Sequence, residues 1–151
     1  MTQKDKELLL KDLCMRLPYG VICEFKRSTL NVLYNNIYDN TLTINNIEYV
    51  VKDDSVVRPY LRPMPSMTES EASDMFNVIY PKHKLINVEI EKDRVRFSNK
   101  DEYSKYYHIT LFFNQIYSLE QLDYLNEHHF DHRHLIEKNL ALDCTGLHIY
   151  D

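Results

Sequence analysis

Residues 85–98 read LINVEIEKDRVRFS, and this stretch decides the fold. Apolar and polar residues alternate along 85–91 and again along 94–98, which is typical of strands that bury one face. Lys92 and Asp93 separate the two runs and predict a turn, so the stretch is predicted to be an antiparallel hairpin. Residues 106–113 are predicted to form a third strand, which makes a three-stranded antiparallel sheet.

Helical segments are predicted both before and after this sheet in the sequence. The predicted helices cover residues 3–16, 69–79, about 119–128 and a short piece at 135–139. Leucines recur at helical spacing in the first, and Pro18 ends it. Capping boxes, in which Ser or Thr precedes Glu or Gln by three residues, predict that the second and third helices begin after Thr68 and Ser118.

The segment between the first helix and residue 58 is predicted to contain short strands only. The candidate strands are residues 19–25, 29–38, 41–44, 47–51 and 56–57, with turns at Asp39-Asn40 and Asp53-Asp54. Because no helical segment interrupts them, their spacing predicts a small antiparallel β meander or an SH3-like open barrel.

Residues 58–67 read RPYLRPMPSM, and three prolines within seven residues favour an extended connector over a strand or a helix. A length of 151 residues predicts a single domain, 1–151. Its possible sub-units are a helix plus a small β unit (1–58) and an α+β unit (66–151). Residues 140–142 and 147–150 are expected to supply a last strand. The predicted fold class is α+β.

The composition argues against several functional classes. The chain has 44% hydrophobic and 27% charged residues, as a globular protein does, and its 2 glycines argue against glycine-rich phosphate-binding loops. A net charge of −5 argues against nonspecific binding to nucleic acid. The odd number of cysteines and an N-terminus with neither a secretory segment nor a membrane span predict a cytoplasmic protein. Cys14, near the leucine face of the first helix, is expected to be a buried, inert thiol.

Residues 128–138 read HHFDHRHLIEK and hold four of the 7 histidines. An HxH pair faces one metal ion only on a strand, whereas this segment is predicted to be a helix end and a turn. We therefore predict neither a metal nor another cofactor, and expect a polar network in which Asp131 caps the next short helix and Arg133 pairs with an acid. His129, Asp131 and Arg133 are candidate binding residues.

Two further surfaces are candidates for binding. Arg58, Tyr60 and Arg62 on the proline-rich connector could dock onto a partner in polyproline geometry. Arg94 and Arg96, with tyrosines nearby, could form a face that stacks bases and binds phosphate. Acidic residues alternate with these arginines, and this favours a solvated strand face.

Four segments carry a resemblance to known proteins: residues 11–21, 58–69, 128–133 and 135–142. They resemble a family of small uncharacterised proteins encoded by phages and mobile elements of gut Bacteroidales bacteria. In the family pattern, tyrosine and glycine stand where this chain has His132 and His134, and glycine stands where it has Asn139. The resemblance implies an accessory protein of a phage or mobile element that works in the cytoplasm of a bacterial host.

Three hypotheses for the function follow. The first is a non-enzymatic accessory protein that acts by binding a host protein, since the resemblance and the 12 tyrosines favour a contact surface. The second is a protein that binds or sequesters a small nucleotide signal in counter-defence. The third is a metal-dependent nuclease. Neither nucleic acid nor a membrane is an expected partner, and no oligomeric state is predicted.

Overall fold

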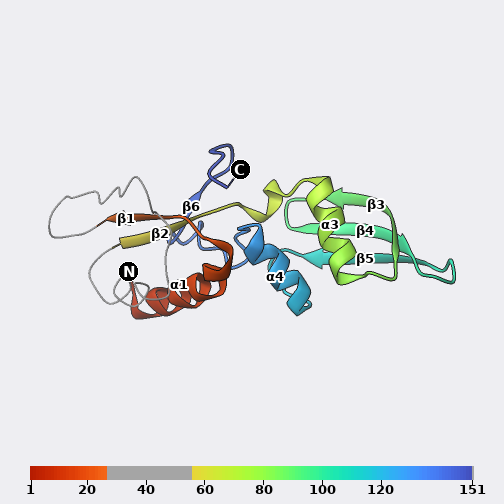
Figure 1. Ribbon diagram of the computed structural model, residues 1–151, viewed down its shortest axis with the longest axis horizontal. Helices are drawn as coiled ribbons and strands as arrows, with labels where there is room; N and C mark the ends of the chain where they lie inside the picture. The colour runs from red at the N-terminus through yellow and green to blue at the C-terminus, as the bar shows by residue number, and fades with distance from the viewer. Residues whose placement is uncertain (27–55, 151) are drawn as a thin grey trace. The chain divides into compact units, whose positions relative to one another are not determined.

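The computed structural model describes residues 1–26 and 56–150, and these residues form an α+β fold, as predicted (Figure 1). The chain divides into two compact units, each with its own hydrophobic core. Unit 1 comprises Met1–Arg62 and Arg133–Asp151, and unit 2 comprises Pro63–His132. The C-terminal segment thus belongs with the N-terminal residues, whereas the possible division at 58–66 placed it with the central sheet.

Unit 2 contains the predicted three-stranded antiparallel sheet, in the order β3–β4–β5. Its strands are β3 (Lys84–Ile90), β4 (Arg94–Lys100) and β5 (Tyr106–Phe112). The hairpin prediction is confirmed, since Glu89 lies opposite Arg96 and Ile90 opposite Val95. A bulge between Leu85 and Asn87 interrupts the pairing near the start of β3.

One face of this sheet packs against α3 (Glu69–Ile79), which begins and ends where the sequence predicts. The Thr68 hydroxyl accepts a hydrogen bond from the Glu71 amide, and the Glu71 carboxylate accepts one from the Thr68 amide. Phe76 of α3 lies on Phe97 of β4, with ring centroids 4.9 Å apart. Burying aromatic rings of this size holds the helix to the sheet.

The helix α4 (Leu119–Glu127) packs on α3, and the Tyr124 hydroxyl donates a hydrogen bond to the Glu71 carbonyl. The Ser118 hydroxyl caps the helix through the Gln121 amide, as predicted. The reciprocal bond differs from the prediction, because the Gln121 side chain accepts from the Tyr117 amide, one residue before the cap.

Unit 1 begins with α1 (Gln3–Arg16), again with the predicted bounds and with Thr2 as its cap. Its sheet has the order β1–β2–β6. The strands are β1 (Cys23–Lys26), β2 (Val56–Leu61) and β6 (Leu142–Asp143). The β1–β2 pair is antiparallel, whereas β6 runs parallel to β2. The core residues of this unit come from α1, from β1 and the residues just before it, from β2 and from the segment 135–141.

The prediction that residues 58–61 form a connector is wrong, because β2 continues through Pro59 to Leu61. The Tyr60 amide donates to the Ile22 carbonyl on the β1 side, so the neighbouring Pro59 nitrogen points to the other side. On that other side of β2, the strand β6 pairs only with Tyr60 and Leu61. A proline fits because its missing N–H falls where no ladder bond is needed.

The short helix predicted at 135–139 is also wrong, since these residues form turns. The Leu140 amide donates to the Leu135 carbonyl, and His134 and Asn139 adopt a left-handed φ of 57°. Asp131 therefore has no following helix to cap. The strands and turns predicted at 29–38, 41–44, 47–51, Asp39-Asn40 and Asp53-Asp54 lie outside the described residues. Among the described helices, none has the length and apolar character needed to cross a membrane.

Candidate functional site

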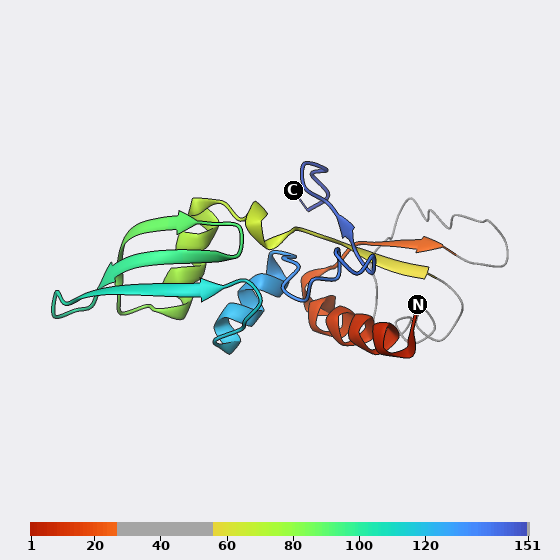
Figure 2. The same cartoon turned by 180° about the vertical axis from the view of Figure 1, so that it is seen from behind.

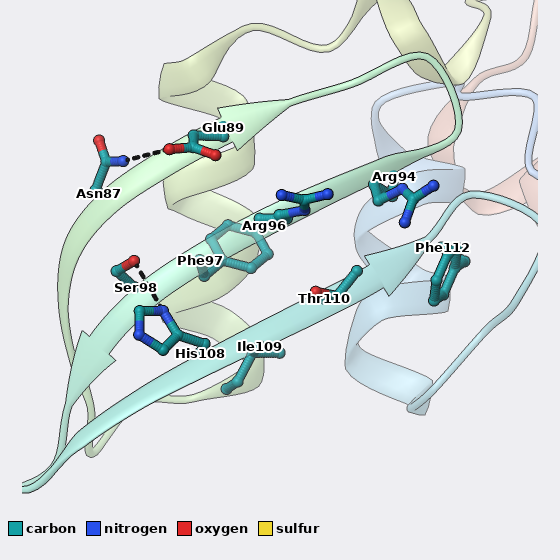
Figure 3. A pocket seen from close by; sticks show the side chains of 10 residues that line it. All are labelled: Asn87, Glu89, Arg94, Arg96, Phe97, Ser98, His108, Ile109, Thr110 and Phe112. Atoms are coloured by element: carbon teal, nitrogen blue, oxygen red, sulfur yellow. Dashed lines mark hydrogen bonds between the residues drawn. The ribbon is translucent and has the colours of Figure 1, made fainter.

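The open face of the β3–β4–β5 sheet, which is the face turned away from α3, carries polar and charged side chains (Figure 3). The strand register aligns these side chains into rows across the sheet. The rows are Asn87–Ser98–His108, Glu89–Arg96–Thr110 and, on two strands only, Arg94–Phe112. The alternation that buries Val95 and Phe97 beneath this face is what turns these side chains outward.

This face contains an open hollow of about 620 Å³. Its lining residues are Asn87, Glu89, Arg94, Arg96, Phe97, Ser98, His108, Ile109, Thr110 and Phe112. The volume is in the range of sites that hold small molecules or a few side chains of a partner protein. The lining combines two guanidinium groups, an imidazole, an aromatic ring and the Glu89 carboxylate. The guanidinium groups and the ring suit an anionic or planar group that avoids the Glu89 side.

Arg94 is held at one end of the hollow by contacts on several sides. Its Nε and Nη2 donate to both carboxylate oxygens of Asp93, at 2.8 and 3.0 Å, and its Nε lies 3.3 Å from a Glu91 oxygen. The guanidinium also lies over the Phe112 ring, 4.9 Å from the ring centroid. These hydrogen bonds from Arg94 lower the pKa of the Asp93 carboxyl. The guanidinium is therefore held in place over the Phe112 ring before any ligand or partner binds.

Arg96 stands at the centre of the same face, and its Nη2 lies 2.9 Å from a Glu91 oxygen. Its side chain is 49% exposed, so the pair is a surface ion pair of modest strength. A guanidinium has five N–H donors, and the pair with Glu91 uses those of Nη2 only. In the adjacent row the Ser98 hydroxyl and His108 Nδ1 are 3.2 Å apart. Arg96 can thus bind an incoming acceptor while Glu91 holds its orientation.

Of the residues predicted in the histidine stretch, Arg133 does pair with an acid. Its Nε lies 3.2 Å from Asp12 Oδ1, and its Nη2 donates to the Met15 sulfur at 2.8 Å. Asp12 is fully buried, so this contact ties the C-terminal segment to α1. The Arg133 side chain is 17% exposed. Because both residues belong to unit 1, the contact with Asp12 is a packing contact inside that unit.

His129 and Asp131 lie on the other side of the division between the units and are both buried. His129 has a left-handed φ of 57°. The neighbouring His132 is hydrogen-bonded through Nε2 to Asn126 Oδ1 at 3.0 Å, and both side chains are buried. His129 and Asp131 are thus buried side chains of unit 2, whereas Arg133 belongs to unit 1.

Arg58, Tyr60 and Arg62 alternate along β2 and its end, half-buried on one side of the strand. They are not in polyproline geometry. Arg58 pairs with Glu24 of β1 at 2.6 Å and reaches Asn139 at 3.3 Å. The Tyr60 carbonyl accepts a hydrogen bond from the Tyr150 hydroxyl. These two residues join β1, β2 and the C-terminal segment of unit 1.

The hollow itself was missed by the sequence interpretation, which favoured a solvated face for Arg94 and Arg96. The acids do pair with both arginines, but Phe112 and His108 come from β5 and turn the face into a lined hollow. The sequence signal that could have revealed the hollow is the alternation of exposed and buried residues, which β4 and β5 share. Within the described ranges, no three His, Cys, Asp or Glu side chains are grouped so that they could hold a metal ion.

Comparison with known proteins gave no relative to set beside this site. No protein-family model, no curated protein and no solved structure matches the chain.

Proposed function

We propose that the protein is a non-enzymatic binding protein that acts on another protein, and that the open face of the β3–β4–β5 sheet is its contact surface. The single observation that carries this proposal is the hollow of about 620 Å³ on that face, lined by Arg94, Arg96, His108 and Phe112. Arginine and aromatic residues are the side chains most enriched in the energetic centres of protein interfaces. The resemblance to phage and mobile-element proteins supports a host protein as the partner.

The charges on this part of the chain indicate what the partner presents. Between Lys82 and Lys105, seven Lys or Arg stand against five Asp or Glu, although the whole chain has a net charge of −5. Arg94 and Arg96 share Glu91, so each guanidinium is oriented before a partner arrives. The face therefore suits a segment with carboxylates at its centre and an apolar or aromatic side chain for the Phe112 end.

Charge reversal at the centre of the hollow tests this proposal. Affinity capture from a bacterial host lysate would compare the wild type with Arg96→Glu and with Lys82→Glu. Lys82 lies in the turn before β3, is exposed, and lies outside the hollow, so its reversal is a matched change of charge. We expect the captured protein to bind Lys82→Glu as it binds the wild type, and Arg96→Glu at least about ten-fold more weakly.

The fold control is a thermal melt of each variant, because Arg96→Glu removes a surface ion pair worth about 0–1 kcal/mol and also places a new carboxylate beside Glu91 and opposite Glu89. A partner that binds all three proteins equally, or that loses affinity for Lys82→Glu as much as for Arg96→Glu, would place the contact elsewhere and refute the proposal for this face.

The hollow favours a second candidate function, the binding of a small nucleotide signal. Two arginines can bind phosphate, and the Arg94–Phe112 pair offers a flat surface for a base. A thermal-shift screen with cyclic nucleotides and ADP-ribose-type compounds would test it. A ligand at about 100 times its Kd adds about 2.7 kcal/mol to the free energy of unfolding. The shift should vanish in Arg96→Glu and persist in Lys82→Glu.

A further inference from the structure

The two outer strands of the β3–β4–β5 sheet differ in how well their edges are protected. The β3 edge contains a bulge between Leu85 and Asn87 and carries the charged side chains of Lys84 and Glu89. Bulges and charges are the usual devices that keep an edge strand from pairing with another chain. The β5 sequence, YYHITLF, has neither a charged residue nor a proline, and its seven residues pair without a bulge.

The hydrogen bonds of the sheet reveal which β5 backbone groups face outward. The Phe113 amide donates to the Asp93 carbonyl, and the Asp101 amide donates to the Lys105 carbonyl. In an antiparallel ladder this places the odd-numbered residues of β5 in bonds to β4 and turns the even-numbered ones to the edge. The Phe112 amide is satisfied by the Tyr117 hydroxyl.

This leaves Tyr106, His108 and Thr110 with their amide and carbonyl groups directed to the edge of the sheet. Figures 1 and 2 show β5 as an outer strand of its sheet from both sides. Within the described ranges, no residue forms a hydrogen bond to these groups. All three side chains are exposed on the open face, Tyr106 to 71%.

We infer that β5 pairs with β5 of a second copy of this chain, antiparallel and centred on His108. The spacing of the outward residues is symmetric about His108, as a two-fold axis requires. His108 then lies opposite the partner's His108, and Tyr106 lies opposite the partner's Thr110. Each of these pairs can exchange both backbone hydrogen bonds. The neutral strand meets its own copy without like-charge repulsion.

The pairing joins the two open faces into one. His108, Thr110 and Phe112 line the hollow, so the hollows of the two copies meet across the β5–β5 junction. A strand pair without other contacts is smaller than a standard interface, and we expect a dissociation constant on the order of 10–100 µM. Self-association is independent of the proposed partner binding, since either can hold when the other fails.

Charge pairing at position 108 tests the inference. Light scattering after size exclusion, from about 1 µM to about 500 µM protein, should show the wild type shifting from monomer to dimer. His108→Glu and His108→Lys should each remain monomeric at about 100 µM, because like charges then face each other across the axis. An equimolar mixture of the two variants should recover the dimer, since Glu then faces Lys.

The matched controls are Asn87→Glu and Asn87→Lys. Asn87 is exposed in the same row as His108 but on β3, so its charge changes the same face without reaching the β5 edge. Both controls should dimerise as the wild type does. A wild type that stays monomeric at about 500 µM overturns the inference. So does a mixture of His108 variants that stays monomeric, or an equal loss in the Asn87 variants.

A backbone variant tests the hydrogen bonds directly. Thr110→Pro removes one outward amide, and proline is tolerated where the N–H of an edge strand faces solvent. Its circular dichroism spectrum should match the wild type and its dimer should be lost. A folded Thr110→Pro that dimerises with unchanged affinity would contradict pairing through β5.

Discussion

Asp12 and Arg16, one turn apart on α1, form an ion pair in which both side chains are completely buried. Arg16 Nε lies 2.7 Å from Asp12 Oδ2, and Nη2 lies 3.2 Å from Oδ1. Arg133 approaches the same carboxylate from the C-terminal segment. One buried carboxylate thus joins two parts of unit 1 that are more than 100 residues apart in sequence.

Asp12→Asn is expected to destabilise unit 1 severely, by about 3–5 kcal/mol, because it leaves a buried guanidinium without its counter-charge. Urea unfolding measures the loss. The control is the triple variant Asp12→Leu/Arg16→Met/Arg133→Met, which removes the carboxylate together with both arginines that approach it and should lose much less than the single variant. A loss below about 1 kcal/mol for Asp12→Asn would contradict the structural role of this pair.

Tyr150 ties the C-terminal segment to β2 and to the residue just before β1. Its hydroxyl accepts a hydrogen bond from the Ile22 amide at 3.1 Å and donates to the Tyr60 carbonyl at 2.7 Å. Burial raises the pKa of this hydroxyl, so it stays protonated and keeps its donor. Tyr150→Phe should cost about 1–3 kcal/mol in the free energy of unfolding, since both backbone groups lose their partner.

The same substitution at Tyr103 is the control for this experiment. Tyr103 is 83% exposed, so Tyr103→Phe should leave the urea midpoint unchanged. If Tyr150→Phe is as stable as Tyr103→Phe, the two hydrogen bonds of Tyr150 do not hold the segment.

Local signals in the sequence predict the helices of this fold well. The bounds of α1 and α3 follow from caps at Thr2 and Thr68 and from the prolines at 18 and 81. The strand β2 was predicted only at residues 56–57. Its continuation could not be predicted in this way, because Pro59 is tolerated in a strand only when its nitrogen points to a side of the ladder where no hydrogen bond is needed. That side is set by β1 and β6, which come from distant parts of the sequence.

The candidate site was predictable only in part, for a similar reason. Alternation along β4 places Arg94 and Arg96 on one face, but the register between β4 and β5 is what brings Phe112 beside Arg94. In the turns after residue 133, His134 and Asn139 adopt left-handed φ angles. A glycine at these positions would have predicted such angles, whereas a histidine or an asparagine does not. The predicted short helix failed at these residues.

The three cysteines should differ sharply in reactivity. Cys14 is exposed, which corrects the expectation of a buried thiol, whereas Cys23 and Cys144 are buried. Burial raises the pKa of both buried thiols, so little thiolate, the reactive form, is present. Mass spectrometry after brief alkylation of the native protein should find the label on Cys14 alone.

Cys14→Ser provides the control for the labelling, because the native variant should stay unlabelled and the urea-unfolded variant should take label at both remaining cysteines. Rapid labelling of Cys23 in the native protein would show that the β1 end of the unit 1 core is open to solvent.

Asp101 closes the turn between β4 and β5, and it therefore sets the register on which the hollow depends. Its Oδ1 accepts from the amides of Tyr103 and Lys105, both at 2.9 Å, and its Oδ2 accepts from the Tyr107 hydroxyl at 3.0 Å. The backbone bond from Lys105, aided by the Tyr107 hydroxyl and the Tyr103 amide, lowers the pKa of Asp101 below its ordinary 3.8. The folded state thus favours the charged carboxylate.

Because the pKa of Asp101 is lowered by folding, the stability it contributes is complete above pH 3.8 and is lost as the pH falls through the folded pKa. Asp101→Asn should have a lower melting temperature than the wild type at pH 7, and this difference should narrow as the pH falls below 3.8 toward the folded pKa. Glu102→Gln, the exposed neighbour, should show no such gap. If the melting temperatures of the wild type and Asp101→Asn do not converge as the pH falls below 3.8, the carboxylate charge does not stabilise this turn.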